Sequence, residues 1–150
     1  MCIFIPTKAL IFMKKLLFGK PGPAAVHFAL LLMRVVWGVT MIPAHGWPKL
    51  AGFDQKKATF MDFMGLGSTL SLGLAVFAEF FCSLLLIAGL FTRLATLPLI
   101  ITMLVIMQQH EWALIGKYES VIFFFTGYVL ILILGPGKYS LDQKFIYKSR

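Results

Sequence analysis

Four long apolar runs constrain the fold of this chain more than any other feature. They cover residues 24–44, 71–91, 94–107 and 121–134, and their only Asp, Glu, Lys or Arg residues are Arg34 and Glu79. A helix needs about 17–25 mostly apolar residues to cross a bilayer. The first two runs reach that length. The other two reach it when their polar ends join the helix, over 93–110 and 117–134. We therefore predict an all-α integral membrane protein, an up-down-up-down four-helix bundle.

The composition excludes the main alternatives to a membrane protein. The chain of 150 residues is 59% hydrophobic and 13% charged, whereas soluble domains are about 45–50% apolar and about 25% charged. Intrinsic disorder needs low hydrophobicity. We predict one domain, with spans over 24–134 between tails over 1–23 and 135–150. Met13, followed by two lysines, is a second candidate start within the first tail.

Glycines and prolines mark the expected helix ends. Pro43, Gly46 and Pro48 are expected to end the first helix, and the sequence Gly-Pro-Gly at 135–137 to end the fourth. Proline lacks an amide donor, and glycine readily adopts positive φ. Gly65 and Gly67 are expected to interrupt any helix in the long first loop.

The net charge of +8 indicates how the helices are oriented. Nine of the fourteen basic residues fall in the two tails and in the short second loop at Arg93. Lys and Arg collect on the cytoplasmic side of membrane proteins, so we predict that both termini are cytoplasmic. The charge then needs no nucleic-acid partner, and no basic-aromatic recognition motif is present. The partner implied directly is the lipid bilayer.

Arg34 and Glu79 are the two strong charges inside the spans. Counted from the ends of their runs, both fall near mid-depth. An ionisable residue in a membrane costs at least about 2.5–3.5 kcal/mol to insert, so it usually finds a partner inside the protein. We expect the two to pair with each other. The pair would serve either as a structural fastener of helix register or as the charged floor of a buried site.

Polar residues also gather at the ends of the spans that are expected to face outward. His45, Lys49, His110 and Glu119 could line a pocket above the two buried charges. Trp47 and Trp112 stand beside them, and the alternative is an ordinary interfacial belt, in which such aromatic residues are common. We expect no metal site, because the Glu-x-x-His repeats of di-iron bundles are absent. Cys2 and Cys82 are not expected to pair.

Three motifs in order resemble the DoxX/DoxD family of four-helix bacterial membrane proteins. The first is an Arg in the opening span followed by His-Gly-x-x-Lys, and the second is a Glu before Leu-Leu-x-x-Gly-Leu-x-Thr-Arg. The third is a closing Gly-x-Gly-Lys-Tyr-Ser-Leu-Asp. Here they comprise Arg34, His45, Gly46, Lys49, Glu79, Leu85, Leu86, Gly89, Leu90, Thr92, Arg93 and residues 135–142. The resemblance implies a multi-pass protein of the bacterial inner membrane.

The resemblance also implies membrane redox chemistry. One founding member of the family is a subunit of a thiosulfate:quinone oxidoreductase, and others are linked to thiol and oxidative-stress complexes. We therefore expect a quinone-linked oxidoreductase subunit, with quinone as cofactor or substrate and other membrane subunits, or a second copy, as partners. The alternatives are a non-catalytic assembly or anchoring subunit and a small-solute permease.

In the oxidoreductase hypothesis each candidate residue has a role. Arg34 and Lys49 would bind an anion or a quinone oxygen, and Trp47 and Trp112 would cover the ring. The acidic and imidazole groups would exchange protons. The candidates for that role are Glu79, Glu119, His45 and His110. Because no redox-active group is evident in the sequence, electrons would come from a bound cofactor or a partner subunit.

Overall fold

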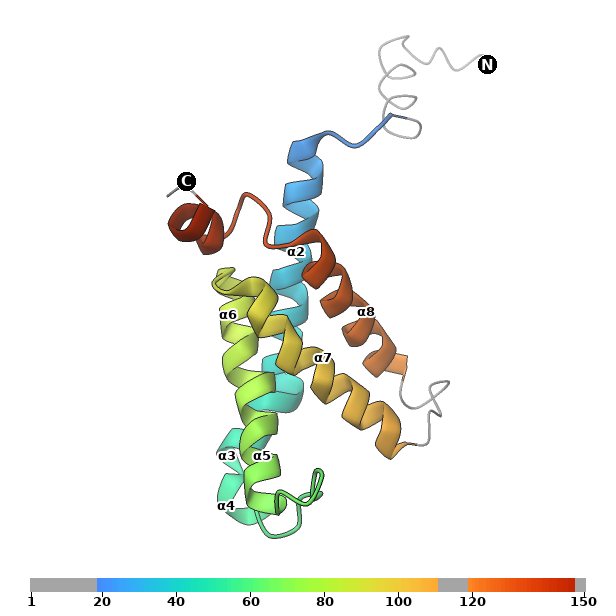
Figure 1. The fold of residues 1–150 in the computed structure, drawn as a ribbon, viewed down its shortest axis with the longest axis vertical. Coiled ribbons are helices and arrows are strands. Elements are labelled where there is room, and N and C mark those ends of the chain that lie inside the picture. Colours follow the sequence, from blue (N-terminus) through green and yellow to red (C-terminus); the bar gives the residue numbers. More distant parts are fainter. Residues whose placement is uncertain (1–18, 111–118, 148–150) are drawn as a thin grey trace, which may run out of the picture.

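The computed structural model describes residues 19–110 and 119–147, and every element in these ranges is helical (Figure 1). The prediction of an all-α protein is confirmed. The elements in chain order are α2 (Pro23–Met41), η1 (Ile42–Gly46), α3 (Trp47–Ala51), α4 (Phe53–Lys56), α5 (Ser68–Val76), η2 (Phe77–Cys82), α6 (Ser83–Ala88), α7 (Thr92–Gln109), α8 (Glu119–Leu134) and η3 (Gln143–Tyr147). The three η elements are π-helical, with hydrogen bonds that span five residues.

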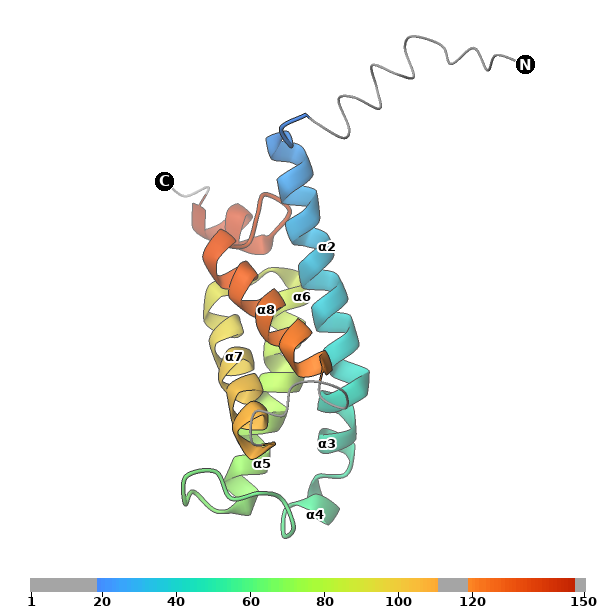
Figure 2. The same ribbon diagram turned by 90° about the vertical axis from the view of Figure 1, so that its right-hand side faces the viewer.

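All of these elements except α4 and η3 join into four helical rods. The first runs over Pro23–Ala51, the second over Ser68–Ala88 and the third over Thr92–Gln109, and all three are long and apolar enough to cross a membrane. The fourth rod, Glu119–Leu134, is apolar but shorter. The start of α2 and the end of α8 lie at the same end of the molecule (Figures 1 and 2). The side of the membrane that this end faces stays a prediction.

The first rod does not end where its prolines predict. The helix continues through Pro43 and Pro48 to Ala51, first as η1 and then as α3. The expectation fails for a physical reason. Each proline occupies one of the first two positions of a helical segment, where the missing amide hydrogen breaks no bond within that segment. The other expected breaks are confirmed, since Gly65 and Gly67 have positive φ and α8 ends at Leu134.

Two glycines set how the first rod packs against the second. A Cβ atom on Gly38 would lie 3.0 Å from the carbonyl oxygen of Ser83, and one on Gly46 would lie 2.7 Å from that of Glu79. Small residues allow such close approach of helix backbones. Later residues of the first rod therefore face earlier residues of the second, so the two rods run antiparallel in a fixed register.

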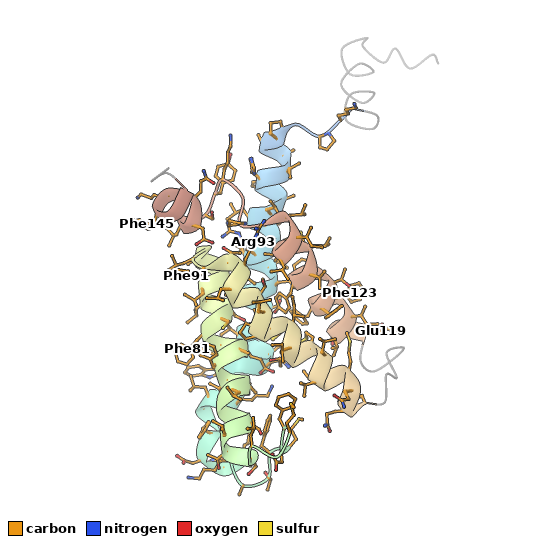
Figure 3. The ribbon with its side chains drawn as sticks, viewed as in Figure 1. Phe81, Phe91, Arg93, Glu119, Phe123 and Phe145 are labelled. Atoms are coloured by element: carbon orange, nitrogen blue, oxygen red, sulfur yellow. The ribbon has the colours of Figure 1, made fainter. Side chains whose placement is uncertain are left out.

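The remaining two rods complete the core. The indole Nε1 of Trp37 donates to the carbonyl oxygen of Phe123 at 3.0 Å and so joins α2 to α8. The fully buried apolar core side chains come from all four rods, and they are Met41, Leu72, Leu86, Leu99, Tyr128 and Ile131. Phe81 and Phe123 are exposed and point away from the bundle (Figure 3). Exposed aromatic side chains on apolar spans indicate a lipid-facing surface.

Candidate functional site

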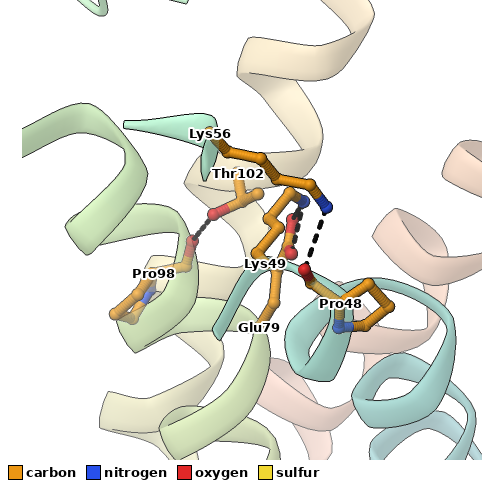
Figure 4. Close-up of polar contacts among 6 residues, drawn as sticks. All are labelled: Pro48, Lys49, Lys56, Glu79, Pro98 and Thr102. Atoms are coloured by element: carbon orange, nitrogen blue, oxygen red, sulfur yellow. Dashed lines mark hydrogen bonds and ion pairs between the residues drawn. The ribbon is translucent and has the colours of Figure 1, made fainter. Parts of the chain in front are cut away.

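A buried ion pair joins the first rod to the second. The Nζ atom of Lys49 lies 2.6 Å from Oε1 and 2.5 Å from Oε2 of Glu79 (Figure 4). The side chain of Glu79 is 1% exposed and that of Lys49 is 20% exposed. A carboxylate in such a dry setting is costly unless it is paired and hydrogen-bonded. The ammonium of Lys49 supplies that compensation to both carboxylate oxygens.

The pair lies where two π-helical segments meet. Glu79 belongs to η2, and the backbone of η1 packs against it through Gly46. Lys49 follows three residues later, on the first turn of α3. π turns often occur at functional sites. Two of them in contact at one ion pair therefore make this region the candidate functional site. The sequence carried part of this signal, in the His-Gly-x-x-Lys motif and the intramembrane Glu.

The ion pair forms part of the wall of a cavity of about 380 Å³. This volume falls within the range of about 300–1,000 Å³ that is typical of small-molecule sites. The rest of the lining is almost entirely apolar and comes from three places. They are the first half of the second rod (Ser71, Leu74, Ala75, Phe77, Ala78), the middle of α7 (Pro98, Ile101, Thr102, Val105, Ile106) and the loop before α5 (Phe60, Met61, Phe63). This wall was not recognisable in the sequence, because its residues look like ordinary span residues.

Two further groups surround Glu79 outside the cavity. His45, on η1, lies within electrostatic range of Glu79 and Lys49, and its ring stands edge-on to Phe124 at 6.1 Å. Tyr128, on α8, also interacts electrostatically with Glu79. Its hydroxyl is fully buried and has no hydrogen-bond partner in the described part of the chain. Tyr128 was not identified from the sequence, where the one available signal was a hydroxyl in an apolar span.

Arg34 does not pair with Glu79, so that expectation was wrong. Its guanidinium is fully buried, donates from Nη2 to the carbonyl oxygen of Tyr139, and packs directly on Gly89. The register explains the error. Glu79 faces Gly46, so Arg34 stands twelve residues, or about 18 Å at 1.5 Å per residue, from the level of Glu79. Counting depth from the ends of the apolar runs had placed both residues at the same level.

The C-terminal segment closes over Arg34. The carboxylate of Asp142 accepts hydrogen bonds from the amides of Phe91 and Thr92, at 2.6 and 2.8 Å. The amide of Asp142 in turn donates to the carbonyl oxygen of Gly89 at 2.8 Å. Asp142 therefore caps the start of α7 from a distant part of the chain. We call this arrangement of Arg34, Tyr139 and Asp142 on the turn at Gly89–Thr92 the C-terminal clasp.

The other candidate residues lie elsewhere. Trp47 is exposed, and its ring stacks at a tilt on Phe80, 6.2 Å away. His110 follows the end of α7, and Glu119 begins α8 at the end away from Arg93 (Figure 3). Trp112 falls outside the described residues. Within 19–110 and 119–147, no group of three or more His, Cys, Asp or Glu side chains is placed to hold a metal ion.

The fold and the site together define a helical membrane protein with a buried Lys–Glu pair in the wall of an apolar cavity. The DoxX family model matches residues 29–112, which is more than half of the chain. The chain belongs to the DoxX family. Comparisons with curated proteins and with solved structures gave no match. The matched range includes Arg34, Lys49 and Glu79, whereas α8 and the C-terminal half of the clasp lie beyond it.

Proposed function

We propose that this protein is a small subunit of a quinone-linked oxidoreductase that serves thiol or oxidative-stress chemistry in the bacterial inner membrane. The observation that carries the proposal is the apolar cavity with Lys49 and Glu79 in its wall. A quinone head is a flat apolar ring with carbonyl oxygens. Such a group needs mostly apolar walls and a few placed donors, as small-molecule sites generally provide.

Lys49 is the residue that suits a quinone oxygen. An ammonium carries three N–H donors, and two of them point to the carboxylate of Glu79. The third is left for a ligand oxygen in the cavity that Lys49 lines. A hydrogen bond from a charged donor contributes about 1.5–3 kcal/mol. Lys49 therefore binds and orients the ring, in the role that the sequence analysis shared between Lys49 and Arg34.

Glu79 is the residue that suits proton exchange. It borders the cavity, and His45, an exposed residue of η1, lies within electrostatic range of it. Reduction of a quinone to a quinol takes up two electrons and two protons. The electrons come from a redox group of a partner subunit. The protons reach the ring oxygen by way of Glu79, with His45 exchanging protons with the solvent.

Binding of a quinone analogue to the purified protein in detergent tests the proposal. The double variant Lys49→Gln/Glu79→Gln keeps a neutral hydrogen-bonding pair and removes both charges. We expect it to bind about 10–100-fold more weakly than the wild type, as loss of a charged hydrogen bond predicts. Lys57→Gln, at an exposed lysine outside the cavity, is the matched control and should bind normally. Equal binding by the double variant would refute the proposed site.

The second candidate function is that of a non-catalytic assembly or anchoring subunit. It is favoured by the C-terminal clasp, because Arg34, one of the candidate ligand-binding residues, is engaged in holding the fold together. If the wild-type protein binds no quinone analogue yet co-purifies in a fixed ratio with a larger membrane complex, this second function replaces the first. The same preparation identifies the partner subunits.

The proposed orientation has its own test. With both termini in the cytoplasm, alkaline phosphatase fused after the C-terminus should be inactive, because that enzyme folds only in an oxidising compartment. Fusion within the first loop, between α4 and α5, should be active. The opposite pattern would reverse the assignment of the Lys49 side of the cavity to the outer face.

A further inference from the structure

The mouth of the cavity is formed by residues that also belong to the outer surface. Leu74, Phe77 and Ile101 line the cavity, and they are 46%, 50% and 53% exposed. They lie on α5, η2 and α7, which are parts of two spans. A surface of this kind faces hydrocarbon when the helices cross a bilayer. The cavity therefore opens sideways toward lipid, between the second rod and α7.

The end of the cavity nearest the first loop is covered. Phe60, Met61 and Phe63 of that loop are half-buried and form this part of the wall. The loop is held in place by its own hydrogen bonds. The amide of Phe63 donates to Oγ of Ser71 at 2.9 Å, and the amide of Gly67 donates to Oδ1 of Asp62 at 2.8 Å.

These two features point to one class of ligand and one route. We infer that the site takes a long-chain isoprenoid quinone directly from the bilayer. Its ring lies against Lys49, and its tail leaves between Phe77 and Ile101 into the lipid. The inference rests on the proposed function and adds to it the substrate class and the direction of entry. A water-soluble quinone without a tail would lack the apolar contacts at the mouth.

Two photoactivatable quinones in liposomes test this inference on the intact protein. One carries a diazirine on the ring and the other carries it on the third isoprenoid unit, and mass spectrometry locates the labelled residues. We expect the ring probe to label the segments around Lys49 and Glu79. The tail probe should label Phe77, Ile101 or their immediate neighbours. An excess of unlabelled long-chain quinone should abolish both signals.

A variant at the mouth provides the second arm. Ile101→Trp fills the opening, and we expect about a tenfold loss of tail-probe labelling, as overpacking of a fitted site predicts. Leu94→Trp is the matched control, because Leu94 lies two turns earlier on the same helix, is 65% exposed and does not line the cavity. It should be labelled like the wild type.

The outcomes separate the two proposals. Ring labelling at Lys49 with tail labelling in the first loop, around Phe60 and Phe63, would overturn entry from the bilayer and leave the proposed function standing. Unchanged labelling of Ile101→Trp would also overturn it. Absence of competed labelling with either probe would overturn the proposed function itself. A tailless quinone that competes as well as the long-chain one would overturn the assigned substrate class.

Discussion

Lys49 and Glu79 are thirty residues apart in sequence, and inside the bundle Nζ of Lys49 donates to both carboxylate oxygens of Glu79, at 2.6 and 2.5 Å. The pair brings a positive charge from the end of the first rod to a negative charge in the middle of the second. Taken alone, either charge would be costly at this depth. Together they form a neutral unit that the apolar walls can surround.

Removing only one member of this pair should be strongly destabilising. Lys49→Met leaves the carboxylate of Glu79 buried without its cation, and we expect a loss of about 3–5 kcal/mol in the free energy of unfolding. Lys49→Met/Glu79→Gln should regain most of that loss, because no uncompensated charge remains. Unfolding in mixed detergent micelles with increasing dodecyl sulfate measures both. Equal losses in the single and double variants would contradict the assignment.

The exposed pair of Lys57 and Asp54 serves as the control for that experiment. Their Nζ and Oδ1 atoms are 2.8 Å apart, and the hydrogen bond from Lys57 lowers the pKa of Asp54. A lowered carboxyl pKa stabilises the fold above the ordinary pKa, and the contribution disappears as the pH falls through the lowered value. Because water screens an exposed pair, we expect Lys57→Met to leave stability unchanged at neutral pH.

The contact between the two π-helical segments should not tolerate a methyl group. A Cβ atom at position 46 would stand 2.7 Å from the carbonyl oxygen of Glu79. We expect Gly46→Ala to cost about 1–3 kcal/mol, since backbone must move to make room. Gly73→Ala is the control within α5, where a Cβ atom meets nothing within 4 Å. There alanine should stabilise the helix by about 0.5–1 kcal/mol. Similar effects at both positions would refute close packing at Gly46.

The stability that Asp142 gives to the start of α7 should depend on how many acceptor oxygens its side chain carries. Asp142→Ala leaves the amides of Phe91 and Thr92 without their acceptors, and we expect a loss of about 0.5–2 kcal/mol. Asp142→Asn keeps one oxygen and should lose less. Hydrogen exchange at Thr92 should accelerate in the same order. Exchange at Thr92 that is unaffected in both variants would contradict the clasp.

The buried hydroxyl of Tyr128 has no partner among the described residues, and a buried unsatisfied polar group costs free energy. We therefore expect Tyr128→Phe to raise the free energy of unfolding by about 1 kcal/mol. Unfolding measured as for Lys49 checks this. A loss of stability instead would mean that the hydroxyl is bonded in the folded protein, for example by an internal water.

The sequence was sufficient for the class of fold and for most helix ends, because hydropathy and glycine are local signals. It was insufficient for Arg34, whose partner depends on the register between two rods. That register is set by Gly38 and Gly46, and the sequence does not indicate which residue of the second rod packs against either glycine. Pro43 and Pro48 led to a wrong prediction of the end of the first helix. A proline in the first two positions of a helical segment does not interrupt that segment, and both prolines occupy such positions.

The candidate site was likewise predictable from the sequence only in part. Glu79 was identified because a charged residue stands out in an apolar run, and Lys49 because polar residues gather at the end of the first span, although their pairing was not foreseen. The cavity walls were not identified, since residues such as Leu74 and Ile101 resemble any other lipid-facing residues. The closing motif was useful only as a resemblance. In the structure its Asp142 proves to bind the turn before α7, so two of the motifs are halves of one contact.

The π-helical segments determine where the chain can lose a residue without disturbing the ion pair. A π turn holds one residue more than an α turn at the same point. Deleting a single residue from η1 would allow the first rod to become wholly α-helical. Because the residue removed is the extra one of the π turn, the turns beyond the deletion keep their rotational position, and Lys49 still faces Glu79. A single-residue deletion within 42–46 should therefore preserve the ion pair, whereas the same deletion in the α-helical stretch before it would turn Lys49 by about 100° away from Glu79.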